Sequence, residues 1–483
     1  MQWSHYSEAI FDMFANTSHN IIVQACPGAG KTTNIAHMWS LTDKSTCYLV
    51  FNKHNQIEAQ AKLFDRPGSA VLTLNSLGHR AIMATYGRVQ LDDRKVYKLI
   101  KQHIPFVGMS YKERQETSYT LYKAVQVAKM IDTDGSLSAQ QLDSAIDTYD
   151  LESYHGMYAD VIKLLDISDN TLSVIDFADQ IRLPAISNAI HMPQYDIILG
   201  DEVQDFSPVQ AQMISRMHSR YVLVGDSHQS IYGFRGAMSN SMTVLKRMFG
   251  CAELPLSITY RCATDIVDVA RAIYPDIEAW EQSPQGKVWQ WPADIPEKTQ
   301  GEDILIYDTD TLVLCRNNKP LIDLAFSLLA DGIPCHVRGR DIGDGLVKLI
   351  KKQECSTVRQ LIDSLTVWYE VEQQRSIAKE DDSIVQRAYD KVQSILVFTS
   401  KCKMSDHPDT VITLIDTLFD QGKGCCLSTV HKAKGLEAQR CYLLQSDLFS
   451  RASNRAKLAW QKEQERNILY VAVTRAKEEL VYM

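Results

Sequence analysis

Short apolar runs alternate along the chain with longer segments of helical periodicity. Trp3, Tyr6, Ile10, Met13 and Phe14 recur at the spacing of one helix face, which predicts a helix over 3–16. The strands predicted downstream are residues 21–23, 46–51, 70–74, 196–200 and 221–225. Strands that alternate with helices predict an α/β fold with a parallel, doubly wound sheet, whose ligands bind at the carboxyl ends of the strands.

The same alternation returns later, after two stretches that are mainly helical. Strands are predicted at 311–315 and 426–430, and they indicate a second α/β lobe. The strand signals fade over 86–169 and again over 344–423, so both stretches are interpreted as helical insertions. The expected division is a first lobe over 1–85 and 170–247 and a second lobe over 248–343 and 424–483.

Composition places the chain among ordinary globular proteins. Of 483 residues, 45% are apolar and 23% are charged, and no apolar run approaches the ~20 residues of a membrane span. The N-terminus lacks a basic region followed by an apolar core, so no secretion signal is expected. Eleven cysteines without a C-x-x-C pair indicate free thiols in a reducing cytoplasm. Because no apolar run is long enough to span a membrane, no membrane partner is expected.

Charge is distributed unevenly around a net value of −8, which argues against indiscriminate binding of polyanions but permits a local basic channel. Residues 132–179 hold eleven acidic side chains and one lysine, and we expect them to form a solvated acidic face. Residues 427–483 hold ten Lys/Arg against six Asp/Glu, an excess that could face an anionic ligand.

A glycine-rich turn follows the first predicted strand and is the clearest chemical signal in the chain. Its sequence is Ala25-Cys26-Pro27-Gly28-Ala29-Gly30-Lys31-Thr32, and Thr33 continues into the next helix. Glycines let the backbone approach an anion, and the exposed N–H groups at a helix N-terminus favour phosphates. Lys31 adds a point charge and Thr32 a hydroxyl for Mg²⁺, so the turn predicts a binding site for ATP and Mg²⁺.

Two further blocks follow predicted strand ends. In Asp201-Glu202, the first carboxylate could hold Mg²⁺ and the second could orient or deprotonate the attacking water; the alternative is an acidic helix N-terminus. In the block over 224–237, Gln229 could sense a γ-phosphate. Phe234 beside Arg235 pairs a stacking face with a cation for nucleic acid, although a core phenylalanine is the alternative.

The order of these blocks resembles superfamily 1 helicases of the UvrD/Rep/PcrA type, including the subgroup of F-box DNA helicases. The blocks that carry the resemblance are 25–32 (motif I), 73–80 (Ib), 173–179 (the block before motif II), 201–205 (II), 225–237 (III), 256–261 (IV), 428–437 (V) and 467–476 (VI). They run through nearly the whole chain and leave only the two insertions unmatched.

The resemblance implies two RecA-like P-loop motor lobes with the nucleotide in a cleft between them. It assigns Tyr260 to stacking on adenine, Glu437 to the ribose, and Arg261 and Arg475 to the γ-phosphate. A surface salt bridge is the alternative role for Arg475. The glutamine that reads adenine in the family is replaced by Tyr6, so adenine preference is less secure than ATP hydrolysis.

The resemblance also implies a set of nucleic-acid contacts. They are Phe51 (a loose match to motif Ia, with a shifted match at Val50 as the alternative), Asn75 (where motif Ib usually has histidine), Phe234, Arg235, Thr429 and His431. Both departures from the family pattern concern contacts on the first lobe.

The first hypothesis is an ATP-driven DNA helicase that moves 3′ to 5′ along single-stranded DNA and unwinds duplexes in replication, repair or recombination. We expect a monomer that binds single-stranded and forked DNA and works with proteins of those pathways. A DNA-stimulated ATPase that displaces bound proteins is the alternative. A nucleotide-switched interaction module is a third reading, against which the two arginines and the Asp-Glu pair argue.

Overall fold

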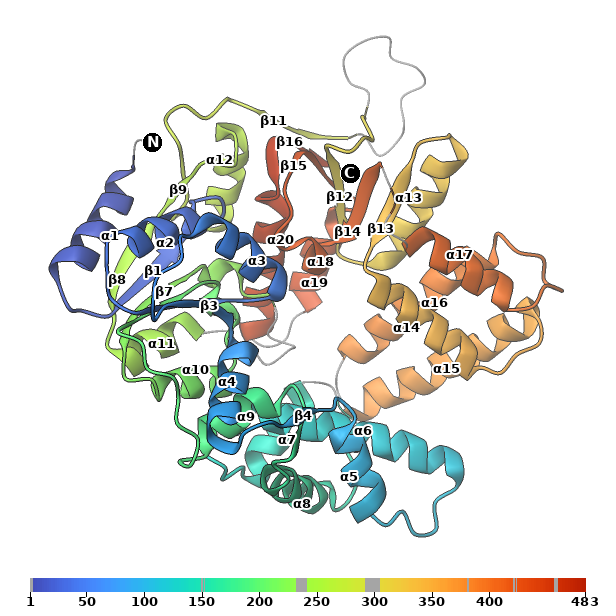
Figure 1. Cartoon of the computed structure of the whole chain (residues 1–483). Helices are drawn as coiled ribbons and strands as arrows, with labels where there is room; N and C mark the ends of the chain where they lie inside the picture. Colours follow the sequence, from blue (N-terminus) through green and yellow to red (C-terminus); the bar gives the residue numbers. More distant parts are fainter. Residues whose placement is uncertain are drawn as a thin grey trace. The chain divides into compact units, whose positions relative to one another are not determined.

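The computed structural model describes residues 3–148, 151, 153–231, 241–291, 305–379, 382–419, 422, 424–455 and 459–483. The chain divides into two compact units, Met1–Ile258 and Thr259–Met483, drawn from blue to green and from yellow to red in Figure 1. Each unit contains one six-stranded sheet in which all neighbouring strands are parallel. The predicted α/β class with two parallel sheets is therefore confirmed.

The first sheet has the strand order β3-β2-β6-β7-β1-β8. Its strands are β1 (Ile21–Ala25), β2 (Thr46–Val50), β3 (Ala70–Thr73), β6 (Ile197–Gly200), β7 (Arg220–Gly225) and β8 (Ala252–Leu256). The order brings the carboxyl ends of β1, β6 and β7 to one edge, where the three predicted blocks begin. The helices of this unit outside the insertion are α1 (His5–Asn16), α2 (Lys31–Ser40), α3 (Lys53–Lys62), α4 (Leu74–Tyr86), α9 (Asp179–Ile186), α10 (Pro208–Ser215) and α11 (Ser241–Phe249).

Strand β8 is the one member of this sheet that the apolar pattern did not predict. Glu253 and Pro255 alternate with less exposed residues, so the segment lacks a continuous apolar run. Proline cannot donate to a ladder, which suits an edge strand, and β8 pairs on one side only, with β1. The boundary expected at 247/248 precedes this strand.

The first insertion is a helical cluster with its own apolar core. Its helices are α5 (Lys95–His103), α6 (Tyr111–Ile131), α7 (Ala139–Thr148) and α8 (Met157–Asn170). Helix α6 begins with a capping box, in which Ser110 and Glu113 each accept a backbone N–H from the other. The short strands β4 (Gln90–Leu91) and β5 (Val174–Ile175) pair in parallel and hold together the two ends of the insertion.

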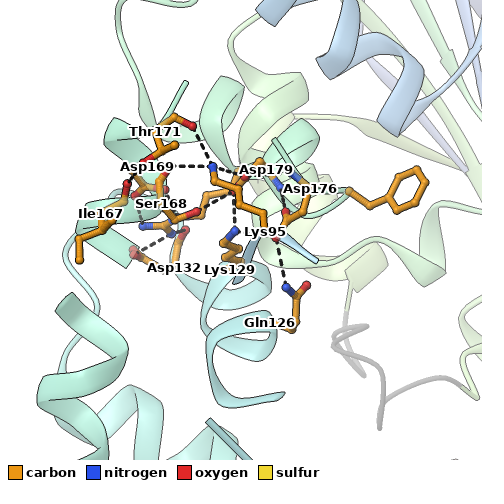
Figure 2. Close-up of polar contacts among 12 residues, drawn as sticks. Lys95, Gln126, Lys129, Asp132, Ile167, Ser168, Asp169, Thr171, Asp176 and Asp179 are labelled. Atoms are coloured by element: carbon orange, nitrogen blue, oxygen red, sulfur yellow. Dashed lines mark hydrogen bonds and ion pairs between the residues drawn. The ribbon is translucent and has the colours of Figure 1, made fainter. Parts of the chain in front are cut away.

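A buried ion network joins this insertion to the turn between β5 and α9 (Figure 2). The Lys129 Nζ atom lies 2.6 Å from Asp179 Oδ1 and 2.9 Å from Asp176 Oδ2, while Lys95 Nζ lies 2.7 Å from Asp179 Oδ2. None of these four side chains is more than 4% exposed. Burial raises the pKa of Asp179, but the two lysines outweigh it and hold the pKa below its usual range.

The solvated acidic face expected over 132–179 is therefore wrong for part of that segment. Asp176 and Asp179 are buried with the lysines, and the Arg182 guanidinium lies 2.8 Å from Asp132 Oδ2 and 3.0 Å from Asp169 Oδ2. Carboxylates are placed in the interior here because cations on neighbouring helices neutralise them.

The second sheet has the order β11-β16-β15-β12-β14-β13. Its strands are β11 (Lys287–Gln290), β12 (Thr311–Cys315), β13 (Cys335–Arg338), β14 (Cys425–Thr429), β15 (Ala438–Leu443) and β16 (Ala476–Tyr482); the remaining short strands are β9 (Ile258–Thr259) and β10 (Glu278–Ala279). The helices of the second unit are α12 (Thr264–Ile273), α13 (Asn318–Ala330), α14 (Arg340–Lys352), α15 (Val358–Lys379), α16 (Asp382–Thr399), α17 (Asp409–Phe419), α18 (Val430–Ala433), α19 (Asp447–Arg455) and α20 (Ala459–Val473).

The second insertion differs from the first because it shares the core of its sheet. Leu361 of α15 and Ile415 of α17 belong to the same buried cluster as Val313 of β12 and Leu427 of β14. All eleven cysteines are free thiols, as expected. Within the described residues, the structure contains no helix that is both long and apolar enough to span a bilayer.

The ion network makes a direct prediction about stability. Lys129→Met removes the cation shared by two buried carboxylates, so we expect the free energy of unfolding of the first unit to fall by about 3–5 kcal/mol in urea titrations. Lys62→Met is the control, because the Lys62–Glu58 pair is about half exposed and should contribute at most ~1 kcal/mol. Equal losses in the two variants would contradict a structural role for the network.

Candidate functional site

The glycine-rich turn has the backbone geometry of an anion cradle. Strand β1 ends at Ala25 and helix α2 begins at Lys31. Gly28 and Gly30 have φ values of 74° and 76°, a backbone conformation that is strained for residues with a side chain. The Cys26 N–H donates to the Leu256 carbonyl at 2.9 Å, so strand β8 anchors the start of the turn. The free N–H groups at the start of α2 can therefore receive a phosphate.

Lys31 lies beside the acidic pair Asp201-Glu202, where the carboxyl ends of β1 and β6 come together. Its Nζ atom lies 3.3 Å from Glu202 Oε1, and its side chain is 11% exposed. Burial would lower the pKa of Lys31, but the surrounding carboxylates, Glu202 foremost, outweigh burial and raise it. The ammonium thus stays charged in a largely desolvated place, where its attraction for a phosphate is stronger than in water.

Asp201 has the environment of a cation ligand. Its carboxylate is 6% exposed and accepts a hydrogen bond from the Tyr48 hydroxyl at 2.9 Å. Burial and the charge of Glu202 raise the pKa of Asp201 to about 6. A cation beside the two carboxylates would therefore stabilise their charged forms. The Thr32 hydroxyl also interacts with the Tyr48 hydroxyl.

These residues fit a magnesium ion held together with a nucleotide. Asp201 and Thr32 supply oxygen ligands, and the described residues contain no group of three or more His, Cys, Asp or Glu side chains that could hold a metal alone. Mg²⁺ is commonly bound by one or two protein oxygens plus substrate phosphates and water. When bound, the ion would neutralise charge on the phosphates.

Glu202 has a strained backbone and a side chain open to water. Its φ of 53° lies in the left-handed region, and its N–H donates to Asp201 Oδ1 at 2.9 Å. The side chain is 27% exposed and accepts a hydrogen bond from Gln204 Nε2. Strain of this kind persists only where the surroundings enforce it, and it is concentrated at functional sites.

A chain of hydrogen bonds connects Glu202 to Gln229, and two of its members were not predicted. Gln204 Oε1 accepts the Asp226 N–H at 2.9 Å, and Asp226 Oδ2 accepts from Gln229 Nε2 at 2.7 Å. Burial raises the pKa of Asp226. Both Gln204 and Asp226 lie inside blocks that the sequence analysis singled out, but their pairing depends on β6 and β7 being neighbours. Phe234 and Arg235 lie outside the described residues.

In the second unit, Arg261 and Glu437 form one ionic group. Arg261 Nε lies 2.7 Å from Glu437 Oε2, and Lys477 Nζ lies 2.8 Å from Glu437 Oε1. Burial raises the pKa of Glu437, but the two cations outweigh it and lower the pKa. Tyr260 is 43% exposed beside Trp280, with 5.7 Å between the ring centroids.

Arg475 is buried, which makes a surface salt bridge wrong as its role. It is 1% exposed, and its guanidinium donates to the carbonyls of Val471 at 2.9 Å and Leu436 at 3.1 Å. The Ala438 N–H in turn donates to the Arg475 carbonyl at 3.1 Å. The arginine is thereby fixed where the ends of motif V and motif VI meet.

The predicted nucleic-acid contacts differ in how much surface they offer. Phe51, which follows β2, is 46% exposed, and Thr429 is only 8% exposed. His431 lies in the short helix α18 and is partly exposed. Asn75 Nδ2 donates to the Phe177 carbonyl at 2.9 Å. Phe177 is 53% exposed, so Asn75 supports an uncovered aromatic ring to which the sequence reasoning gave no role.

Two family models match the chain. The UvrD/REP helicase N-terminal domain matches residues 7–250, and the UvrD-like helicase C-terminal domain matches residues 351–483. Together they contain every block on which the nucleotide-site residues of the first unit lie, and all of motifs V and VI.

Several curated proteins are similar to this chain. The F-box DNA helicase protein 1 of Schizosaccharomyces pombe is 25% identical over 96% of this chain and 56% of its own length. The ATP-dependent DNA helicase UvrD2 of Mycobacterium tuberculosis is 24% identical over 72% of this chain and 55% of its own length. A probable DNA helicase II homolog of Mycoplasma pneumoniae is 37% identical over 19% of this chain and 14% of its own length. The chain thus spans little more than half the length of the first two.

The geometry of the site predicts two separable losses. Lys31→Ala should remove the positive charge that attracts the phosphates and so weaken nucleotide binding. Glu202→Gln should preserve binding and lower ATP hydrolysis about 10²–10⁴-fold. Binding is measured with a fluorescent ATP analogue and hydrolysis by phosphate release. Glu58→Gln, at a half-exposed surface glutamate of the same unit, is the control. Near-normal turnover in Glu202→Gln would disprove its assignment to the attacking water.

Proposed function

Because this chain belongs to the UvrD/REP-type helicase family, we propose that it is an ATP-driven translocase that moves along single-stranded DNA and unwinds duplexes. The observation that carries the proposal is the group formed by Lys31, Asp201 and Glu202 at one edge of a parallel sheet. Their cation, metal ligand and candidate base are the parts that phosphoryl transfer to water requires.

In this proposal, hydrolysis begins with ATP and Mg²⁺ at the glycine-rich turn. The N–H groups at the start of α2 and Lys31 would hold the β- and γ-phosphates, while Thr32 and Asp201 would hold the ion. Glu202 accepts a proton from water, and the Gln204 amide keeps its carboxylate oriented.

The second unit contributes further groups to the same proposal. Arg261 and Arg475 would stabilise charge on the transferring phosphoryl group, a contribution of ~10³–10⁵ in rate for a well-placed guanidinium. Tyr260 would stack on the base, and Glu437 would orient Arg261 as well as meet the ribose. The fixed guanidinium of Arg475, held by two carbonyls, supports a preorganised role.

The hydrogen-bonded chain from Glu202 to Gln229 offers a route from nucleotide to DNA. Gln229 ends the short helix over Ser227–Gln229, and the later part of the same block contains Phe234 and Arg235. We propose that loss of the γ-phosphate is transmitted through Gln204, Asp226 and Gln229 to this block. Phe51 and the Asn75–Phe177 pair would hold bases on the first unit, and Thr429 and His431 would contact the strand on the second.

Strand displacement tests the function and its direction. Duplexes with one single-stranded tail, either 3′ or 5′, are incubated with ATP and Mg²⁺, and the released strand is measured by fluorescence. We expect release from substrates with a 3′ tail, as in 3′-to-5′ movement, and none with Glu202→Gln.

Two results would revise the proposal. Release from 5′-tailed substrates alone would reverse the direction. DNA-stimulated hydrolysis without release from either substrate would instead favour an ATPase that displaces DNA-bound proteins. The role in replication, repair or recombination is proposed from the family.

A further inference from the structure

Three tyrosines gather on helices α5 and α6 of the first insertion, away from the nucleotide residues. The rings of Tyr97 and Tyr122 stack with 4.2 Å between centroids and 15° between planes. Tyr119 lies three residues before Tyr122 and therefore on the same side of α6, and it is 51% exposed. Burial raises the pKa of Tyr97, and neighbouring Tyr119 and Tyr122 raise it further.

The charge around these tyrosines favours an anionic partner. The Lys123 Nζ atom lies 4.3 Å from the centroid of the Tyr119 ring. Residues 91–131 carry eight Lys/Arg against four Asp/Glu in a chain whose net charge is −8. Two of the lysines belong to the buried ion network, and the charges of Asp93 and Asp176 act on Tyr122. Lys123 is the cation that contacts the exposed ring of Tyr119.

The helix that carries two of the tyrosines also contacts the segment that carries Phe177. Tyr119, Tyr122, Gln126 and Lys129 follow one another at helical spacing along one side of α6. Gln126 Nε2 donates to Asp176 Oδ2 at 3.3 Å, and Lys129 reaches the same carboxylate at 2.9 Å, as Figure 2 shows. Asp176 directly precedes the exposed Phe177. The buried ion network therefore fixes the segment that carries Phe177 against the same helix that carries Tyr119.

We propose that Tyr119, on the same side of α6 as the stacked pair Tyr97 and Tyr122, is an additional stacking site for bases of single-stranded nucleic acid. The site extends the strand path from Phe177 onto the first insertion, and Lys123 meets the backbone phosphate next to the stacked base. The proposal rests on the proposed function, since it lengthens the path of the same strand. Ring faces with a cation beside them suit bases of any sequence, so the site contributes affinity and length dependence but no sequence preference.

Fluorescence anisotropy with labelled oligothymidylate of increasing length tests the site. We expect Tyr119→Ala to raise the Kd for long oligonucleotides about fivefold to a hundredfold, the loss of roughly one stacked base, and to leave short ones unaffected. Tyr119→Phe keeps the ring and should retain wild-type affinity. Tyr389→Ala removes a comparably exposed tyrosine (45%) from the second unit and is the matched control.

The outcomes separate this inference from the function on which it rests. ATP hydrolysis without DNA and the melting temperature should be unchanged in Tyr119→Ala, because the side chain is half exposed. If the wild type binds oligonucleotides and Tyr119→Ala binds them as tightly as Tyr389→Ala does, the stacking site is refuted while the function stands. The tyrosines would then suit a protein partner. If the wild type binds no single strand, both proposals fail.

Discussion

The attraction between the largely buried Lys31 and the carboxylates of Asp201 and Glu202 is the constraint on which the proposed nucleotide site depends. Neither sign of charge is stable alone at this depth, since burial lowers the pKa of the lysine and raises that of Asp201. They coexist because the order β6-β7-β1 places the ends of β1 and β6 at one edge of the sheet. The resulting group has spare negative charge for a cation and a lysine for phosphate, which is what ATP with Mg²⁺ supplies.

The same principle operates a second time in the first unit, with a different result. Lys95 and Lys129 neutralise Asp176 and Asp179, and all four side chains are almost completely buried. The charges of this network are therefore balanced within the protein. It fixes the turn that precedes Phe177 against α5 and α6. The charged cluster at the carboxyl ends of the strands is proposed to bind phosphate and a cation, whereas the cluster at the insertion holds neighbouring segments in place. The proposed strand path uses the surface that the second cluster holds in place.

The sequence predicted most of the first sheet and brought out the blocks that the sheet places together, because motif blocks and apolar runs are local signals. The contacts it missed join distant segments. Gln204 meets Asp226 only when β6 and β7 pair, and Lys129 meets Asp176 across 47 residues of chain. Strand β8 escaped prediction since Pro255 and Glu253 interrupt its apolar pattern. Exposure of Phe177 likewise depends on packing, and no spacing rule reveals it.

The rate of ATP hydrolysis with and without single-stranded DNA is the most direct test of the central claim that the charged sheet edge drives movement on DNA. Phosphate release is measured with the wild-type chain and Mg²⁺ over a series of oligonucleotide concentrations. The account predicts slow, Mg²⁺-dependent hydrolysis that accelerates and saturates as single-stranded DNA is added. Hydrolysis that does not respond to single-stranded DNA would contradict it.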